Sequence, residues 1–89
     1  MKIKDGFILR EVAGSNIIVG VGEESIDFNG IINVNDTGAF IWNKLCENMS
    51  VEETAKALTE EYDGIDSETA VRDIENFINK LRDAGLVEE

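Results

Sequence analysis

The sequence predicts an α+β fold in which a three-stranded antiparallel sheet precedes three helices. The first part of the chain, up to Val34, contains short runs rich in β-branched residues, separated by glycine and asparagine. The part that follows carries apolar residues at helical spacing. Asn35 and Asp36, which stand between the two parts, are favourable residues for starting a helix. Because the apolar face of a sheet has to be covered, we expect the helices to pack on one side of it.

The first two strands are expected to form a hairpin. Residues 7–12 and residues 17–21 both have the composition of strands. Between them, residues 13–16 read Ala-Gly-Ser-Asn, in which glycine and asparagine can adopt the positive φ angles of a tight turn. The sequence therefore predicts an antiparallel pair with a turn over residues 13–16.

The third strand is expected at residues 31–34, after the Asn29-Gly30 pair, which is a strong hairpin turn signal. Residues 25–28 also alternate between polar and apolar side chains. Their pattern fits either a strand or an extended arm, so their pairing stays open.

The first helix is predicted over residues 36–48, with Asn35 or Asp36 as its N-cap. A helix that is apolar nearly all round is buried. We therefore expect this helix to lie at the centre, in contact with both the sheet and the other helices, and we expect Cys46 to be a small core residue. Its apolar residues are Ala39, Phe40, Ile41, Trp42, Leu45, Cys46 and Met49.

The second helix begins at Ser50, where Ser50 and Glu53 have the spacing of a capping box, and it ends at Asp63-Gly64. The third helix begins near Asp66 or Ser67 and is stopped by Gly85. Residues 86–87 are then expected to fold back onto the core. The apolar residues of the third helix span roughly 140° of arc, which is wider than simple core packing requires. Part of that face is therefore free to cover something else.

Composition excludes most catalytic chemistry. The 89 residues are expected to form one domain, with 43% hydrophobic residues and a net charge of −11. The chain has no histidine, so it lacks the commonest general base and a frequent metal ligand. A single cysteine can form neither an internal disulfide nor a thiolate metal cluster. We expect a cytoplasmic, non-catalytic protein with no cofactor and no membrane partner.

DNA binding is the first of two binding hypotheses, because the second and third helices with the hairpin resemble a winged helix-turn-helix. Residues 50–68, however, contain seven acidic residues and one basic residue. Residues 69–84 contain three of each. Such a surface gains little from contact with phosphates, so we expect no nucleic acid partner.

Peptide binding is the second hypothesis. A short third strand at a sheet edge has unpaired N–H and C=O groups that can accept a peptide as an added strand. The wide apolar face of the third helix would form the opposite wall, fringed by polar residues. These are Arg72, Asn76, Asn79, Lys80 and Arg82. A dimerisation module, in which a second copy occupies the edge, remains a further alternative.

Residues 30–42, Gly-Ile-Ile-Asn-Val-Asn-Asp-Thr-Gly-Ala-Phe-Ile-Trp, resemble the strand-to-helix signature of the PqqD-like family. The capping box at residues 50–53 and the closing residues 81–86 resemble its later landmarks. The family's Cys-Asp-Gly element is replaced by Cys46-Glu47-Asn48, so a related pathway for another peptide is at least as compatible as the quinone pathway itself.

The resemblance implies a peptide-recognition domain that binds the leader of a ribosomally made precursor by strand addition. It would present the precursor to a modifying enzyme, such as a radical S-adenosylmethionine enzyme, as a monomer or weak homodimer. By position, the groove would comprise Ile31, Ile32, Asn33 and Val34 on the strand, and Arg72, Glu75, Asn76, Asn79 and Arg82 on the helix.

Each of these residues also has an ordinary structural interpretation. At least one of Ile31, Ile32 and Val34 is expected to be core, and the helix charges are equally compatible with simple solvation. If the strand is a free edge, Ile32→Pro is expected to abolish binding with little loss of fold.

Overall fold

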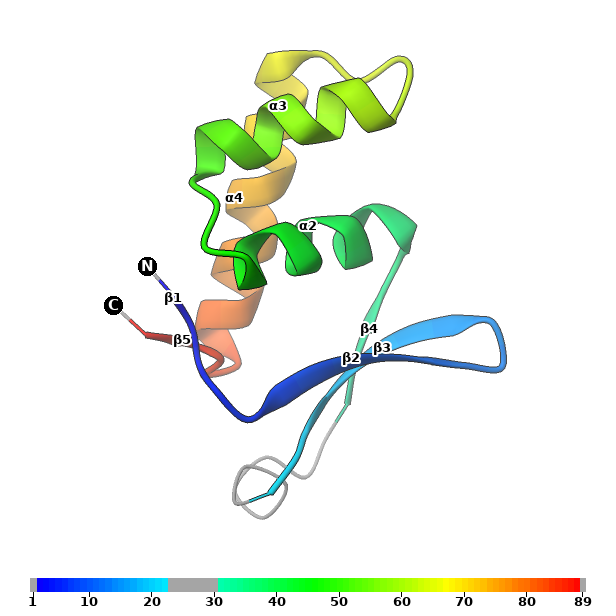
Figure 1. Ribbon diagram of the computed structural model, residues 1–89, viewed down its shortest axis with the longest axis vertical. Coiled ribbons are helices and arrows are strands. Elements are labelled where there is room, and N and C mark those ends of the chain that lie inside the picture. Colours follow the sequence, from blue (N-terminus) through cyan, green and yellow to red (C-terminus); the bar gives the residue numbers. More distant parts are fainter. Residues whose placement is uncertain (1, 23–30, 89) are drawn as a thin grey trace.

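The computed structural model describes residues 2–22 and 31–88 and has the predicted α+β architecture (Figure 1). A three-stranded antiparallel sheet comes first in the chain and three helices follow it. The predictions for residues 25–28 and for the Asn29-Gly30 turn lie outside the described residues. The strands of the sheet are β2 (Phe7–Val12), β3 (Ser15–Gly20) and β4 (Ile31–Val34), and the helices are α2 (Asp36–Cys46), α3 (Val51–Glu61) and α4 (Ser67–Asp83).

The sheet has the order β2-β3-β4, so β3 is central and β4 lies at an edge. Val12 pairs with Ser15, which leaves Ala13 and Gly14 as the two turn residues. Their φ angles are 53° and 82°, as in the type I′ turn that matches the twist of a hairpin. The predicted turn over residues 13–16 was therefore too long, because Ser15 and Asn16 already belong to β3.

A second, two-stranded sheet joins the two ends of the chain. β1 (Lys2–Ile3) pairs antiparallel with β5 (Val87–Glu88). Leu86 precedes β5, is fully buried and accepts a hydrogen bond from the Lys4 N–H at 2.8 Å. The expected return of residues 86–87 to the core is confirmed. β1 was not predicted, because two residues are too few to show a pattern.

The helices begin at the predicted caps. Asn35 accepts a hydrogen bond from the Gly38 N–H, and Asp66 accepts one from the Thr69 N–H, both at 2.7 Å. Ser50 and Glu53 form the complete capping box. These hydrogen bonds lower the pKa of the Glu53 and Asp66 carboxyls. Side-chain caps therefore fix the start of each helix.

Helix α2 is the central helix, as predicted. It contacts α3 on one side and both β1 and β4 on the other, and it buries Ile41, Trp42 and Leu45. Cys46, in contrast, is exposed rather than part of the core. Partial desolvation and the neighbouring Glu47 carboxylate raise the pKa of its thiol. The prediction of a core cysteine was wrong because α2 ends at Cys46, where the protein covers only part of the side chain.

Candidate functional site

The edge strand β4 has two outward-facing residues, and the hairpin register identifies them. In a two-residue hairpin, the residues that flank the turn exchange backbone hydrogen bonds, and every second pair after them does the same. Ser15, Ile17 and Val19 of β3 therefore bond to β2. The hydrogen bond from the Val21 N–H to the Gly6 carbonyl, at 2.7 Å, continues this alternation.

The remaining residues of β3 bond to β4. Ile18 pairs with Ile32, and Asn16 pairs with Val34, so Ile32 and Val34 direct their N–H and C=O groups into the sheet. Ile31 and Asn33 consequently direct theirs away from it. A side chain of α4 supports this assignment, because the Lys80 ammonium donates to the Asn33 carbonyl at 3.3 Å.

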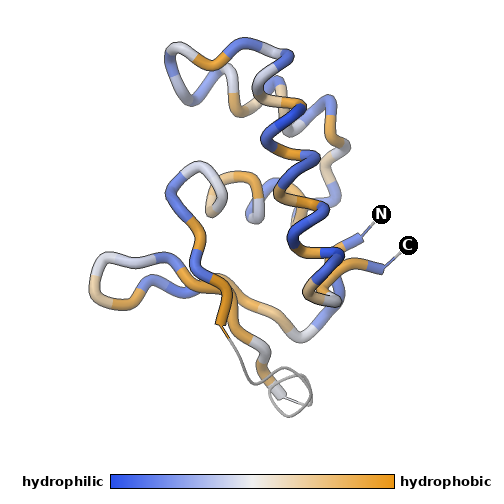
Figure 2. Tube along the Cα trace, turned by 180° about the vertical axis from the view of Figure 1, so that it is seen from behind, coloured by the Kyte–Doolittle hydropathy of each residue, from blue (hydrophilic) through white to orange (hydrophobic). Residues whose placement is uncertain are grey.

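A groove of about 510 Å³ lies between β4 and α4. Figure 2 shows both elements on the same side of the molecule. The lining residues combine apolar side chains at the floor with polar side chains along the rims. They are Asn33, Val34, Asn35, Thr37, Gly38, Ile41, Ile65, Asp73, Asn76, Phe77 and Lys80.

Helix α4 lines the groove with one stripe of residues. Asp73, Asn76, Phe77 and Lys80 are spaced at i, i+3, i+4 and i+7, which places them on the same side of the helix. The fully buried core side of α4, with Ala70, Ile74 and Leu81, lies about a quarter turn away. Phe77 is half-buried and packs against the core, so it joins the groove floor to the core.

The start of α2 closes the floor of the groove. Gly38 lies so near β4 and α4 that a Cβ atom there would approach the Val34 Cβ to 3.2 Å and the Phe77 ring to 3.5 Å. The N-cap hydrogen bond from the Gly38 N–H to the Asn35 side chain fixes this first turn of α2. Asn16 holds the same end of the sheet, because its amide donates to the Asp36 carboxylate at 3.0 Å.

Of the strand residues predicted for the site, Asn33 and Val34 line the groove. Ile32 and Val34 pack against the core, as expected for at least one of the apolar residues. Ile31 does not line the groove, and its side chain is 58% exposed on the other face of the sheet. Its contribution to the edge is its backbone.

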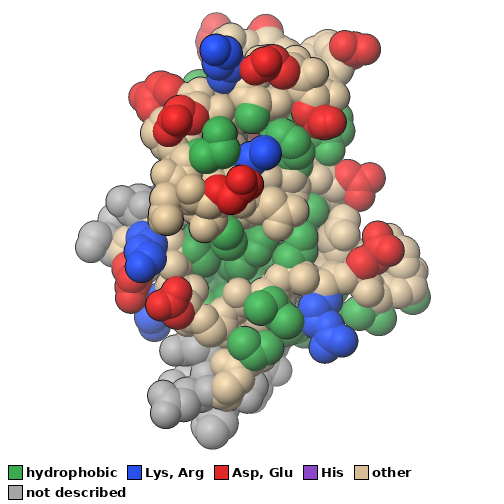
Figure 3. Space-filling view, in the orientation of Figure 1, with side chains coloured by type: hydrophobic (Ala, Val, Ile, Leu, Met, Phe, Trp, Pro, Cys, Tyr) green, Lys and Arg blue, Asp and Glu red, His purple; other side chains and the backbone are tan. Residues whose placement is uncertain are grey.

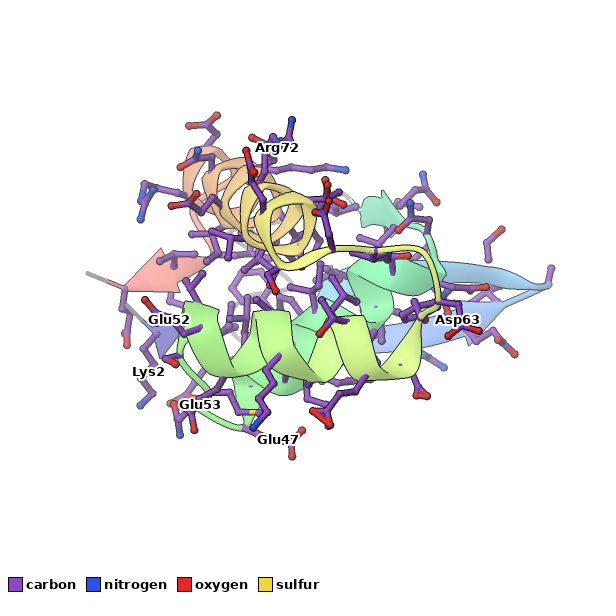
Figure 4. All side chains as sticks on the ribbon, turned by 90° about the horizontal axis from the view of Figure 1, so that it is seen from above. Lys2, Glu47, Glu52, Glu53, Asp63 and Arg72 are labelled. Atoms are coloured by element: carbon purple, nitrogen blue, oxygen red, sulfur yellow. The ribbon has the colours of Figure 1, made fainter. Side chains whose placement is uncertain are left out.

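Of the helix residues predicted for the site, the groove lining includes Asn76. Arg72, Glu75, Asn79 and Arg82 are exposed and lie outside that lining. Figure 4 shows Arg72 on the side of α4 turned away from α3. Arg82 donates instead to Asn79 on its own helix, at 2.8 Å. Four of the five predicted helix residues lie on the polar side of α4, whereas the groove lies where the polar and apolar sides meet.

Charge is distributed unevenly around this groove. The rim carries Lys80 at one end and Asp73 at the other. On the face drawn in Figure 3, acidic side chains gather at the helical end of the molecule near α3. In residues 2–22 and 31–88, no cluster of three His, Cys, Asp or Glu side chains could hold a metal ion. Over the same residues, no helix has the length and hydrophobicity needed to cross a membrane.

Residues 18–87 match the family described as Coenzyme PQQ synthesis protein D (PqqD). The chain belongs to the PqqD family. The matched range begins in β3 and includes β4 and all three helices, so it contains both walls of the groove. A search of curated proteins finds no significant match.

Two solved structures are similar over nearly the whole chain. One is TbiB1 in complex with the TbiA(beta) leader peptide, with a TM-score of 0.77, 25% sequence identity, and coverage of 99% of this chain and 95% of TbiB1. The other is lasso peptide synthetase B1 complexed with the leader peptide, with a TM-score of 0.77 and 20% identity. This match covers 99% of this chain and 96% of the synthetase B1 chain. The second likeness shows the fold alone.

Proposed function

We propose that this protein binds the leader of a ribosomally made precursor peptide as a fourth strand beside β4. The observation that carries the proposal is the pair of outward-facing residues, Ile31 and Asn33, at an edge that faces the groove. Together they offer two N–H donors and two C=O acceptors, the groups that an extended peptide needs for β-augmentation. Membership of the PqqD family and the leader complex of the similar TbiB1 support this choice of ligand.

The groove supplies the side-chain contacts that backbone pairing cannot. Alternate side chains of an added strand point to opposite faces. Those on the helix side would meet the floor formed by Val34, Ile41 and Phe77. An apolar leader residue therefore gains from burial there, and the polar rims bind its neighbours.

Binding of this kind needs no catalytic group, so the protein would act as a non-catalytic carrier in the cytoplasm. It would hold the leader while a separate enzyme modifies the rest of the precursor. That enzyme would be a radical S-adenosylmethionine enzyme or another peptide-modifying enzyme. The net charge of −11 gives an acidic leader little long-range attraction, so contacts in the groove must supply the affinity.

The direct test is a fluorescence anisotropy titration with the labelled leader of the short peptide encoded nearest to this chain's gene. A scrambled leader of the same composition and a 20-base-pair DNA duplex serve as controls. Saturable binding of the leader alone supports the proposal. Equal binding of the scrambled peptide, or tighter binding of the duplex with a steep salt dependence, would overturn it.

A further inference from the structure

The Lys80 ammonium lies where an added peptide strand has to bind. It donates to the Asn33 carbonyl at 3.3 Å, and that carbonyl is one of the two outward acceptors of β4. A peptide N–H that paired with this carbonyl would lie at about 2.9 Å from the oxygen. The ammonium therefore competes with the incoming donor for the same carbonyl oxygen. Lysine at an exposed edge is also a common protection against unwanted strand pairing.

Lys80 has no anionic partner among the residues that the structure describes. Among residues 2–22 and 31–88, no carboxylate forms a salt bridge with it, although the chain carries 19 acidic residues. The one salt bridge found in these ranges joins Lys44 to Glu47. An ammonium displaced from Asn33 would thus lose the acceptor that holds it in the free protein.

We infer that Lys80 covers the edge of β4 in the unliganded protein and selects leaders with an acidic residue beside Asn33. The leader N–H takes over the Asn33 carbonyl, and the leader carboxylate takes over the released ammonium. A leader without a carboxylate at this position displaces Lys80 without compensation and binds more weakly. This inference rests on the proposed function and names the class of leader that the groove accepts.

Asp73 extends the same selection to a second position. It precedes Lys80 by seven residues on the stripe that lines the groove, which corresponds to about 10 Å along the helix. An extended peptide covers that distance with about three residues. The leader residue about three positions from the acidic one is therefore basic or neutral, because a second carboxylate there would face Asp73.

The experiment is a cycle of protein and peptide variants. Each acidic residue of the leader is replaced singly by its amide, Glu→Gln or Asp→Asn, and the Kd is measured for wild type and Lys80→Met. Methionine keeps an unbranched stem but removes the charge and the donors. One replacement is expected to weaken binding to wild type about fivefold. The same replacement should change binding to Lys80→Met less than twofold.

Lys56→Met is the matched control, because Lys56 is an exposed lysine of α3 that does not line the groove. It should retain the wild-type response to every peptide. Lys80→Gln is the second variant if Lys80→Met melts early. Equal penalties in wild type and both Lys80 variants would overturn the role of Lys80 and leave the proposed function intact. A wild-type protein that binds no leader would overturn both.

Discussion

Proline substitutions at Ile32 and Asn33 distinguish the two sides of β4. The register assigns the Asn33 N–H to the open edge and the Ile32 N–H to the ladder with β3. Asn33→Pro therefore removes a donor that the folded protein does not use within the sheet. Ile32, the residue before it, is already extended, as a residue before proline prefers. We expect the free energy of unfolding to change by no more than about 1 kcal/mol.

Ile32→Pro is expected to damage the fold instead. It leaves the Ile18 carbonyl without its donor, at a cost of about 1–3 kcal/mol. It also removes a half-buried isoleucine side chain that packs against the core, which costs less than the about 2–5 kcal/mol of a fully buried one. Together we expect at least about 2 kcal/mol, or a fall in Tm of about 8 °C or more.

Asn33→Pro should affect leader binding much more than it affects stability. Asn33→Pro places its ring at the open edge and leaves a leader carbonyl unpaired, which costs about 1–3 kcal/mol. Affinity should therefore fall about tenfold or more. Asn33→Ala, which keeps the N–H, is the control and should bind within about threefold of wild type.

Thermal unfolding followed by circular dichroism and anisotropy titration with the leader measure the two effects separately. An Asn33→Pro variant that binds the leader as tightly as wild type would refute pairing at the Asn33 N–H. An Asn33→Pro variant that is less stable than Ile32→Pro would refute the assigned register of β4.

Three further predictions concern the groove floor, the core and the helix caps. Phe77→Ala should weaken leader binding about tenfold, whereas Glu75→Ala, outside the groove lining, should change it less than twofold. Equal effects of the two substitutions would contradict leader binding in this groove. Leu86→Ala should lower the free energy of unfolding by about 2–5 kcal/mol in a denaturant titration, because Leu86 is fully buried. A loss below about 1 kcal/mol would show that this end of the chain is not part of the core. The pKa of Glu53 is lowered in the folded state, so its cap stabilises above the ordinary value of 4.5 and is lost as the pH falls through the lowered pKa. The Tm difference between wild type and Glu53→Gln should therefore be largest near pH 7 and shrink below about pH 4, and a difference that grows in acid would contradict this sign.

The helices could be predicted from the sequence because their limits depend on local chemistry. Ser50 and Glu53, three residues apart, form a capping box, and the Asp66 side chain caps α4 by accepting from the Thr69 N–H. The type I′ turn was harder to predict from the sequence, since Ala13 adopts a positive φ angle that alanine seldom adopts. The pairing of β1 with β5 depends on contacts between the two ends of the chain, which no local pattern contains.

The groove could be predicted only in part. Its two walls follow from element order, but the helix residues that line it depend on how α4 is rotated against β4. That rotation places Asp73 and Lys80 toward the strand and leaves Arg72 outside the lining. The directions of the backbone groups of β4 depend on the hairpin register, which is why the sequence suggested proline at Ile32 rather than at Asn33.

Amide hydrogen exchange along β4, measured by NMR with and without saturating leader, tests strand addition most directly. In the free protein, the Ile31 and Asn33 amides should exchange fast, while Ile32 and Val34 are protected by β3. With the leader bound, Ile31 and Asn33 should become protected as well. Saturable binding that leaves both of these amides exchanging at the free rate would contradict strand addition at this edge.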